Sequence, residues 1–360
     1  MSSRVISSPA QVTPSWLTRV LKANGALTAG AVATFDVDAG RGNWSTNAVL
    51  HLHYAAGAQG ELPPRLFLKM VNTDLGEESF GASEVAYYTR DYLGVAGAPL
   101  VRCYDAAHTA RQRRYHLLLD DLSPTHGVAA DRPPTLAYGL ALAEGLAALH
   151  AHWWGAARLA EAAAPIHDAA FVQRFVDIAA PGVDHILAAA GDQLEPHWPS
   201  LVRDLFARHP AALIARTADA NGFTLIHGDV GENNVLAPRQ GDRPIYIIDR
   251  QPFDWSLTTW LGVYDLAYAM LLDWDTPSRR ALEWPVLRRY HDALQQRGVT
   301  GYSWERLVED YRLTAAMAVT VAIEYARDGV TSRWWSFGPT TLRRVLTACD
   351  DLQCAALWAN

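Results

Sequence analysis

Strand-like and helix-like patterns occupy different parts of this chain. Between residues 34 and 71, short runs rich in β-branched and aromatic residues are separated by turns that contain Gly or Pro, and another apolar run, YHLLLDDL, begins at Tyr115. Residues 135–215 and 256–360 instead repeat Ala, Leu and other apolar residues at helical spacing. We therefore expect an α+β chain, with a small antiparallel sheet in residues 1–120 and a larger helical region in residues 121–360.

Two helices are expected within the sheet-rich part. Thr13 and Pro14 are typical of a helix start and Gly25 of a helix end, so a short leading helix should lie between them. The segment SEVAYYTRDYL, which begins at Ser83, carries an aromatic stripe at helical spacing. It predicts a helix between the strands of residues 34–71 and the later strand YHLLLDDL.

The composition is that of a globular protein without a strongly charged partner. Half of the 360 residues are apolar, and 31 Lys and Arg against 38 Asp and Glu give a formal net charge of −7. No global positive field therefore favours nucleic acid or an anionic membrane surface. The three Cys form no CxxC pair, and the sequence has neither an apolar leader nor a run of about 18 uncharged apolar residues. These features predict a cytoplasmic protein, and they fit a monomer or a homodimer.

A polar, strand-rich island interrupts the helical region between residues 223 and 250. It contains LIHGDVGENN, followed by two apolar runs on either side of a turn at Gly241 and Asp242. If these runs pair as a hairpin, Asn234 is expected opposite Asp249, because opposite residues have a constant index sum. An amide oxygen and a carboxylate would then meet at the open end of the hairpin. Such hard oxygen ligands suit Mg²⁺, which also keeps waters and substrate phosphates as ligands.

Asp229 adds another carboxylate to the same loop, five positions before Asn234. A carboxylate beside a metal site can accept the proton of a hydroxyl that attacks phosphorus, so the three residues have the parts that phosphoryl transfer requires. The alternative is an ordinary polar turn, because Asp, Gly and Asn are common turn residues. His227, at the end of an apolar strand, is expected to support the loop by packing and hydrogen bonding rather than to act as a base or a metal ligand.

These segments resemble a known family. HGDVGENNVL, IIDRQ and VYDLAYAML are similar to segments of the aminoglycoside phosphotransferase and choline kinase-like superfamily, and most to its ecdysteroid kinase-like and related bacterial branch. The resemblance implies a bilobed protein-kinase-like fold. It also implies that Asp229 is the catalytic base, that Asn234 and Asp249 bind Mg²⁺, and that Asp265 braces the catalytic loop. Arg250 departs from the family, which usually has an aromatic or aliphatic residue there; Arg250 could reach a phosphate or an acidic substrate, or pair with a surface acid.

A cation for the nucleotide phosphates is expected in the sheet. Lys69 lies in the apolar strand LFLKMV, where an unpaired ammonium would be costly. The following helix offers Glu84 as its partner, with Glu77 and Glu78 as alternatives, and the resemblance implies the pair of Lys69 and Glu84. The alternative for Lys69 is an edge-strand side chain that extends to solvent.

A Gly-rich bend lies between two of the predicted strands, in AGRGNWST. Backbone N–H groups at Gly42 could cover phosphates, and Ser45 or Thr46 could supply a hydroxyl. The bend lacks the third glycine of a protein-kinase loop, and a plain hairpin turn is the alternative.

The nucleotide base is expected where the two parts of the chain join. YHLLLDDLS resembles the hinge strand that binds the purine through its backbone, which places adenine near Leu119, Asp121 and Leu122. The resemblance therefore implies ATP as the phosphoryl donor, with GTP as the alternative.

Contacts to the phosphoryl acceptor are expected in the helical region, where aromatic residues and acids gather. Asp254, Trp255, Trp334 and Trp335 are the main candidates, although core packing is the more common role of a Trp. A cationic acceptor would favour an acidic rim, and a quaternary ammonium would favour an aromatic cage. The further candidates for these roles are Trp260, Asp273, Trp274, Asp275, Glu309, Asp310 and Phe337.

The sequence thus predicts a Mg²⁺-dependent kinase that transfers the γ-phosphoryl group of ATP to a hydroxyl of a small molecule. A natural product or antibiotic is the first expected acceptor, with choline or ethanolamine and a steroid-like alcohol as alternatives. A pseudokinase that binds a nucleotide or a protein without catalysis is the rival from another class. The presence of Lys69, Asp229, Asn234 and Asp249 argues against that rival.

Overall fold

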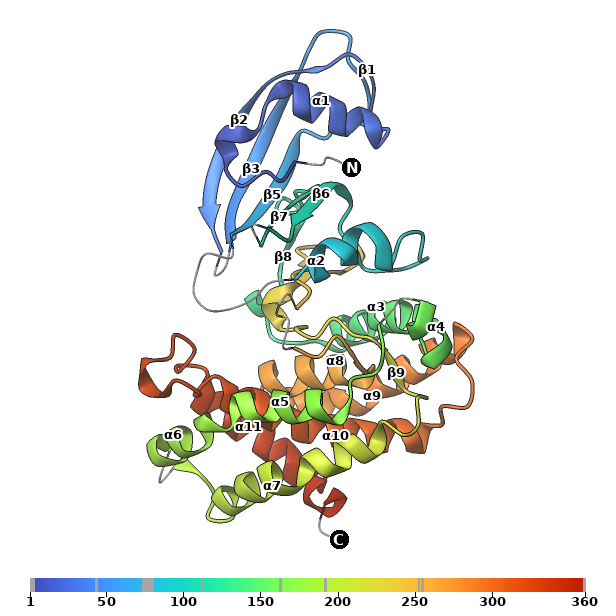
Figure 1. Ribbon diagram of the computed structural model, residues 1–360. Coiled ribbons are helices and arrows are strands. Elements are labelled where there is room, and N and C mark those ends of the chain that lie inside the picture. The colour runs from blue at the N-terminus through green and yellow to red at the C-terminus, as the bar shows by residue number, and fades with distance from the viewer. Residues whose placement is uncertain are drawn as a thin grey trace.

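The sheet lies at one end of the molecule and the long helices lie at the other (Figure 1). The computed structural model describes residues 4–358, except 43–44, 73–80, 112, 162–163, 191–192, 252 and 254–255, and except the side chains of 41, 72 and 156. Both an antiparallel sheet and a helical region are present, so the α+β class predicted from the sequence is confirmed.

Five antiparallel strands form the sheet, in the order β2-β3-β5-β7-β6. Three of them are the strands predicted between residues 34 and 71, and β7 is the predicted YHLLLDDL strand. The edge strand β6 was not predicted, and it pairs with β7 through a register shift between Cys103 and Asp105. The strands are β2 Val32–Arg41, β3 Ser45–Tyr54, β5 Arg65–Asn72, β6 Cys103–Thr109 and β7 Arg114–Asp120, and a separate pair is formed by β1 Leu27–Ala29 and β4 Gln59–Gly60.

The predicted leading helix is α1, Pro14–Ala23, and it covers one face of the sheet (Figure 1). Thr13 caps it by accepting a hydrogen bond from the main-chain N–H of Trp16. Leu17 and Leu21 are fully buried against the alternate apolar residues of β3 and β5, such as Leu50 and Leu68. Because alternate strand residues point to opposite faces, Lys69 and its neighbours Phe67 and Val71 lie on the other face.

The opposite face of the sheet packs against the segment that was predicted as one helix. It is a single α-helical turn, α2 Ser83–Ala86, followed by a π-helical segment, η2 Tyr87–Asp91. Tyr87, Tyr88 and Tyr92 are buried there against Tyr115, Leu117 and Leu119 of β7. The aromatic stripe therefore binds this short segment to the sheet.

The helical region is built around α10, Trp304–Glu324, which contacts the helices α5, α6, α7, α8, α9 and α11. Its small and apolar residues, among them Ala316 and Val319, are fully buried, as expected of a helix surrounded by others. The remaining helices are α3 Leu136–His152, α4 Ala156–Glu161, α5 Ala169–Ala179, α6 Pro181–Ala190, α7 Trp198–Arg216, α8 Val263–Tyr268 with its π-helical continuation η6 Ala269–Asp273, α9 Thr276–Gln296 and α11 Gly338–Asp351. The short 3₁₀ helices are η1 Pro9–Gln11, η3 Ala129–Asp131, η5 Glu232–Asn234, η7 Gly329–Thr331 and η8 Cys354–Leu357.

Short strands run through the helical region and hold the polar island. β9 Phe223–Leu225 pairs with β12 Thr259–Leu261, and β10 Val235–Pro238 lies between β8 His126–Val128 and β11 Tyr246–Ile247. The hairpin of β10 and β11 was predicted, but its expected register was wrong by one residue. Val235 pairs with Ile247, and the N–H of Ile248, not of Asp249, donates to the carbonyl of Asn234.

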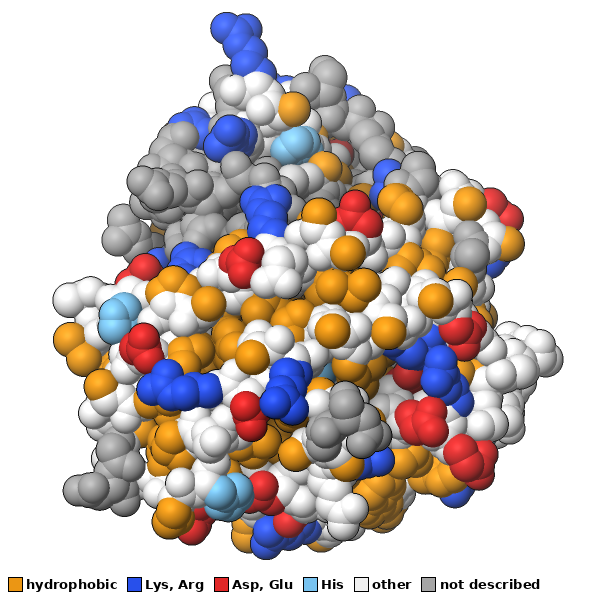
Figure 2. All heavy atoms as spheres, turned by 60° about the horizontal axis from the view of Figure 1, so that its bottom comes forward, with side chains coloured by type: hydrophobic (Ala, Val, Ile, Leu, Met, Phe, Trp, Pro, Cys, Tyr) orange, Lys and Arg blue, Asp and Glu red, His pale blue; other side chains and the backbone are white. Residues whose placement is uncertain are grey.

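The surface of the helical region mixes charges of both signs. On the face turned forward in Figure 2, Lys and Arg alternate with Asp and Glu around apolar side chains. In the part of the chain that the structure describes, no helix combines the length and the apolar character that crossing a membrane requires.

Candidate active site

A cleft of about 610 Å³ is lined by residues of both the sheet and the helical region. On the sheet side the cleft is lined by β3, β5, β7 and α2. On the other side it is lined by the loops that follow β9 and β11, by α5, α8, η6 and α11, and by the C-terminal half of α10 with the segment after it. Lys69, Glu84, Asp229, Asn234 and Asp249, which the sequence singled out from four separate segments, all line this one cleft.

Lys69 joins the two sides of the cleft. Its Nζ donates to both carboxylate oxygens of Glu84, at 2.8 and 2.9 Å, and to Oδ1 of Asp249 at 2.6 Å. The Tyr115 hydroxyl also donates to Glu84. Burial alone would lower the pKa of the Lys69 ammonium, but the charges of Asp249 and Glu84 outweigh burial and raise that pKa. Lys69 is therefore a charged, buried ammonium between two carboxylates. The alternatives Glu77 and Glu78 lie outside the described residues.

Asp249 leaves the hairpin through an unusual backbone conformation. Its φ is +60°, in the left-handed region that residues other than Gly seldom adopt. In a regular strand, the one-residue error in register would send the Asp249 side chain to the opposite face. The left-handed turn ends the strand instead, and the carboxylate lines the cleft beside Lys69.

The loop that carries Asp229 is fixed by hydrogen bonds to Asp265 of α8. The main-chain N–H groups of His227 and Gly228 donate to its two carboxylate oxygens at 2.7 and 2.9 Å, and His150 Nε2 lies 3.0 Å from Oδ2. Burial alone would raise the pKa of Asp265, but the hydrogen bond and charge of His150 outweigh burial and lower it. The carboxylate thus stays ionised and fixes the start of the loop.

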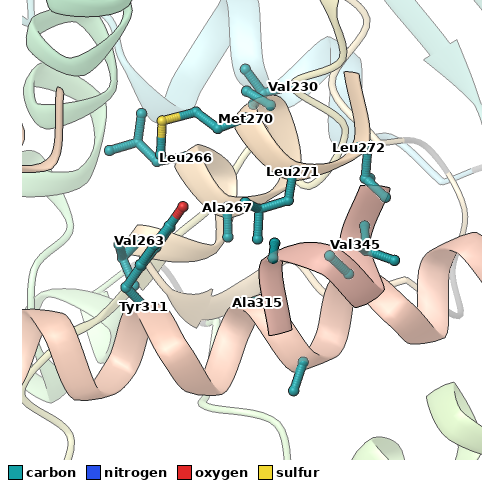
Figure 3. Packing of buried hydrophobic residues seen from close by; sticks show 14 of the residues in the cluster. Val230, Val263, Leu266, Ala267, Met270, Leu271, Leu272, Tyr311, Ala315 and Val345 are labelled. Carbon is teal, nitrogen blue, oxygen red and sulfur yellow. The ribbon is translucent and has the colours of Figure 1, made fainter. Parts of the chain in front are cut away.

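Two further residues anchor the same loop. Val230, next to Asp229, is fully buried and lies beside Met270 in the core cluster of α8, η6, α10 and α11 (Figure 3). The ring of His227 packs edge-on against Tyr87, with 5.6 Å between the ring centroids, and burial lowers its pKa to about 4. The hydrogen bond between His227 and Asp265 comes from the main chain of His227 and not from its ring.

The Asp229 carboxylate accepts a hydrogen bond from the Tyr268 hydroxyl, which lies 2.8 Å from Oδ1. Burial raises the pKa of Asp229 to about 6, and the Tyr268 hydrogen bond opposes this rise. A carboxylate with such a pKa is ionised at neutral pH and is a stronger base than an exposed Asp. Tyr268 was not singled out from the sequence. Its place three residues after Asp265 puts both side chains on one helix face, which is a signal that could have found it.

Asn234 and Asp249 present oxygen atoms that fit Mg²⁺. The Asn234 amide nitrogen donates to the carbonyl of Asp229 at 2.9 Å, which leaves its amide oxygen for another partner. Asp249 uses Oδ1 for Lys69, and its side chain is 45% exposed and lines the cleft. Among the described residues, no group of three or more His, Cys, Asp or Glu side chains could hold a metal ion. One amide oxygen and one carboxylate fit a hard cation whose other ligands are waters and phosphates.

The Gly-rich bend lies at the tip of the β2–β3 hairpin and reaches the cleft. The N–H of Gly42 donates to the Ser45 carbonyl, and the Ser45 hydroxyl donates to Asn47 at 2.8 Å. Gly42, Ser45 and Asn47 line the cleft, whereas Thr46 does not, because its side chain points to the other face of β3. Asn47 was missed, although its period-two spacing from Ser45 was visible in the sequence.

The expected hinge residues do not line the cleft. Leu119 is buried in β7 opposite Phe67, which does line it. The Asp121 carboxylate forms an ion pair with Arg65 at 2.7 Å, and the Leu122 carbonyl accepts hydrogen bonds from its own turn. Two apolar residues of the cleft lie near Leu119: Phe67 is paired with it on β5, and Ile248 packs against the same hydrophobic cluster.

Only some of the residues predicted to contact the acceptor line the cleft. Trp334 and Phe337 line the cleft, whereas Trp335 packs against the core, and Asp254 and Trp255 lie outside the described residues. Of the other aromatic candidates, Trp260 and Trp274 are buried core residues. Of the candidate acids, Asp273 lines the cleft, where burial raises its pKa to about 7. The others lie elsewhere: Asp275 caps α9, Glu309 pairs with Arg306, and Asp310 is buried against Arg216.

Tyr325, Glu324 and Asp328 also line this wall, and they were not singled out from the sequence. They follow one another at the end of α10 and in the segment after it. Their position in the cleft depends on where α10 ends, which the apolar pattern of the helix does not indicate.

Comparison with known proteins identifies the fold. No model of a known protein family matches the sequence, and the comparison with curated proteins finds no match. Among solved structures, a choline kinase from Cryptosporidium parvum Iowa II is similar with a TM-score of 0.58 and 10% identity, over 90% of this chain and 91% of that one. A spectinomycin phosphotransferase in complex with ADP and spectinomycin has a TM-score of 0.54 and 11% identity, over 96% of this chain and 99% of that one. An APH(2″) structure in complex with GDP and kanamycin has a TM-score of 0.51 and 13% identity, over 93% and 99%.

These similarities extend over nearly the whole of each chain, although few residues are identical. They confirm the bilobed protein-kinase-like fold that the sequence resemblance implied. The chain therefore has the same fold as this choline kinase and these two phosphotransferases.

Proposed function

We propose that this protein is a Mg²⁺- and ATP-dependent kinase that phosphorylates a hydroxyl group of a small natural product or antibiotic. One observation carries the proposal: Lys69 bridges Glu84 and Asp249 in a cleft that Asp229 and Asn234 also line. Phosphoryl transfer depends on positioning and electrostatic stabilisation, and these five side chains supply a cation, a base and hard metal ligands.

Each of these side chains has a defined task in the proposed reaction. Lys69, held by Glu84, binds the α- and β-phosphates. Asn234 and Asp249 would hold a magnesium ion, which would supply positive charge to the phosphates. Asp229 accepts a hydrogen bond from the acceptor hydroxyl, orients its oxygen toward the γ-phosphorus and receives its proton. Tyr268 occupies Oδ1 of Asp229 and so leaves Oδ2 for the acceptor.

The wall of the cleft supports an acceptor with both apolar and polar groups. Trp334 and Phe337 offer ring faces, and Tyr268 and Tyr325 offer hydroxyl groups close to Asp229. The acids Asp273, Glu324 and Asp328 favour an amino alcohol such as choline or ethanolamine as the second candidate. Arg327 pairs with Glu324 at 3.0 Å and weakens this acidic character, so the broader class of hydroxylated natural products stays first.

For the phosphoryl donor, ATP is the first candidate and GTP the second. The similar spectinomycin phosphotransferase structure contains ADP, and the similar APH(2″) structure contains GDP, so the fold accommodates either base. The apolar residues Phe67 and Ile248 offer a slot for a purine ring, which both nucleotides share.

The test is ADP release from Mg·ATP with a panel of aminoglycosides, amino alcohols and sterol-like alcohols, followed by mass spectrometry of the products. We expect a product heavier by one phosphoryl group from at least one hydroxylated compound. ATP binding without turnover across the whole panel would instead support the pseudokinase alternative.

A further inference from the structure

Arg250, the residue after Asp249, lines the cleft and forms an ion pair with a buried acid, Asp91, rather than with a surface acid. It is 3% exposed, and its Nη1 lies 2.6 Å from Oδ2 of Asp91, whose side chain is 2% exposed. Arg250 belongs to the loop of Asp249, and Asp91 ends the helical segment that contains Glu84. The ion pair thus connects the two elements whose carboxylates, Glu84 and Asp249, contact Lys69.

We propose that the pair of Arg250 and Asp91 is a positioning element of the active site. It fixes the segment of Glu84 against the loop of Asp249, so that both carboxylates reach Lys69 together. The proposal rests on the proposed kinase function for its kinetic consequences, but its structural consequence can be measured without any turnover.

The surroundings of the pair hold each partner in place. Arg250 Nε lies 3.3 Å from the Ile226 carbonyl, and its guanidinium lies 5.9 Å from the centre of the Tyr87 ring. On the other side, Asp91 accepts a second hydrogen bond from Arg90 at 2.7 Å, and its carbonyl accepts one from the Trp153 indole at 2.8 Å. The pair therefore contacts the segment after β9, through Arg250, and the end of α3, through Asp91.

Two tyrosines add parallel links between the same elements. The Tyr87 hydroxyl donates to the Ile247 carbonyl and the Tyr92 hydroxyl donates to the Leu225 carbonyl, both at 3.2 Å. These neutral bonds bring the segment close to the helical region. The charged pair should have the stronger influence, because Asp91→Asn leaves the buried Arg250 guanidinium without its carboxylate, and Arg250→Met leaves the buried Asp91 carboxylate with Arg90 alone.

The consequence for Lys69 follows from geometry. Glu84 is separated from Asp91 by about two turns of a short helical segment, so a shift at Asp91 is transmitted to Glu84. A displacement of about 1 Å of a group that positions the reactants can lower a rate by about 100-fold. Breaking the ion pair of Arg250 and Asp91 should therefore change kcat/KM for ATP more than the KM for the acceptor.

The experiment compares Arg250→Met, Asp91→Asn and Arg250→Lys with a matched control. The control is Arg216→Met, because Arg216 forms an equally buried ion pair with Asp310, at 2.7 Å, and neither residue lines the cleft. Amide hydrogen exchange of residues 83–92 is measured on the nucleotide-free proteins, and the KM for ATP, the KM for the acceptor and kcat are measured on the same samples.

We expect Arg250→Met and Asp91→Asn to raise exchange in residues 83–92 and to lower kcat/KM for ATP by about 10- to 100-fold, with little change in the acceptor KM. Arg250→Lys keeps the positive charge, so its hydrogen exchange and its kcat/KM for ATP should lie between those of the wild type and of Arg250→Met. It provides the test if the other two variants do not fold. Arg216→Met should leave both readouts near wild type. Unchanged exchange and an unchanged KM for ATP in folded Arg250→Met would overturn the proposal. Absence of turnover in the wild type would instead count against the kinase function, while the exchange data would still decide the role of the pair.

Discussion

Lys69 Nζ lies 2.6 Å from Oδ1 of Asp249, a residue 180 positions later in the chain. This contact connects the sheet side of the cleft with the side formed by the helical region. Glu84 holds the other side of the same ammonium, at 2.8 Å. In the proposed reaction the two carboxylates have different tasks, since Glu84 only positions the lysine whereas Asp249 also binds the metal.

The two carboxylates should therefore differ in their effect on turnover. We expect Asp249→Asn to lower kcat by about 100- to 1,000-fold, as the loss of a group that stabilises transition-state charge does. Glu84→Gln should lower it by about tenfold, because Lys69 would keep its charge and one carboxylate partner. Steady-state kinetics on both variants at saturating ATP provide the comparison. Equal losses in the two would contradict the separate roles.

Asn234 should set the requirement for magnesium. We expect Asn234→Ala to raise the Mg²⁺ concentration needed for half-maximal turnover by about tenfold, because one neutral oxygen ligand is lost while Asp249 remains. The measurement is a titration of turnover with Mg²⁺ at fixed ATP, after removal of metal with EDTA. A variant with an unchanged Mg²⁺ dependence would show that Asn234 is only a structural residue of the loop.

Tyr268 should affect the chemical step rather than ATP binding. Removing its hydroxyl in Tyr268→Phe deletes the hydrogen bond to Asp229, and a bond to a charged group of this kind corresponds to a loss of about tenfold or more in kcat. The KM for ATP should change little. Tyr264→Phe is the control, because Tyr264 lines the same cleft, with its ring centroid 6.1 Å from that of Tyr268, and forms no hydrogen bond with Asp229. Equal effects of the two variants would contradict the assignment.

The loop around Asp229 shows how much of the site could be predicted from the sequence. The spacing of Asp229, Asn234 and Asp249 predicted that they would meet, and they do line one cleft. The predicted register failed by one residue, because hairpin counting assumes a regular strand and Asp249 has a left-handed backbone with φ +60°. Strain of this kind is fixed by tertiary contacts, here with Lys69, and it leaves no periodic signal.

The acceptor wall was the least predictable part of the site. Trp335 and Trp334 are neighbours in sequence, but only Trp334 lines the cleft while Trp335 packs against the core. Which of two adjacent aromatic residues faces the cavity depends on the path of the segment after α10. Composition locates such a cluster in the chain but does not orient it. The same reasoning explains why Tyr325 was missed.

Stability should fall in mildly acidic solution because of buried histidines such as His209. Burial lowers the pKa of His209 to about 4, while the same group in the unfolded chain has its ordinary pKa near 6.5. Below pH 6.5 the unfolded chain binds a proton that the folded protein does not, so stability decreases as the pH falls toward 4. By linkage, His209 alone lowers the free energy of unfolding by about 2 kcal/mol between pH 7 and pH 5.

Chemical denaturation at pH 7 and pH 5 measures this effect, with His209→Phe as the comparison. The variant keeps a ring beside Trp358, whose centroid lies 5.2 Å away, but cannot titrate. It should lose less stability than the wild type between the two pH values, even if it is less stable at pH 7. An equal loss in both proteins would show that His209 does not contribute.

The central claim is that Asp229 is the base of a phosphoryl transfer to a hydroxyl. The most direct measurement is the rate of phosphorylated product formation by wild type and by Asp229→Asn, followed by mass spectrometry with the acceptor that the panel identifies. Asp229→Asn keeps the size of the side chain and can still meet the Tyr268 hydroxyl. We expect product from the wild type and a rate at least about 100-fold lower from the variant, with ATP binding retained. Product formation by Asp229→Asn at the wild-type rate would contradict the central claim.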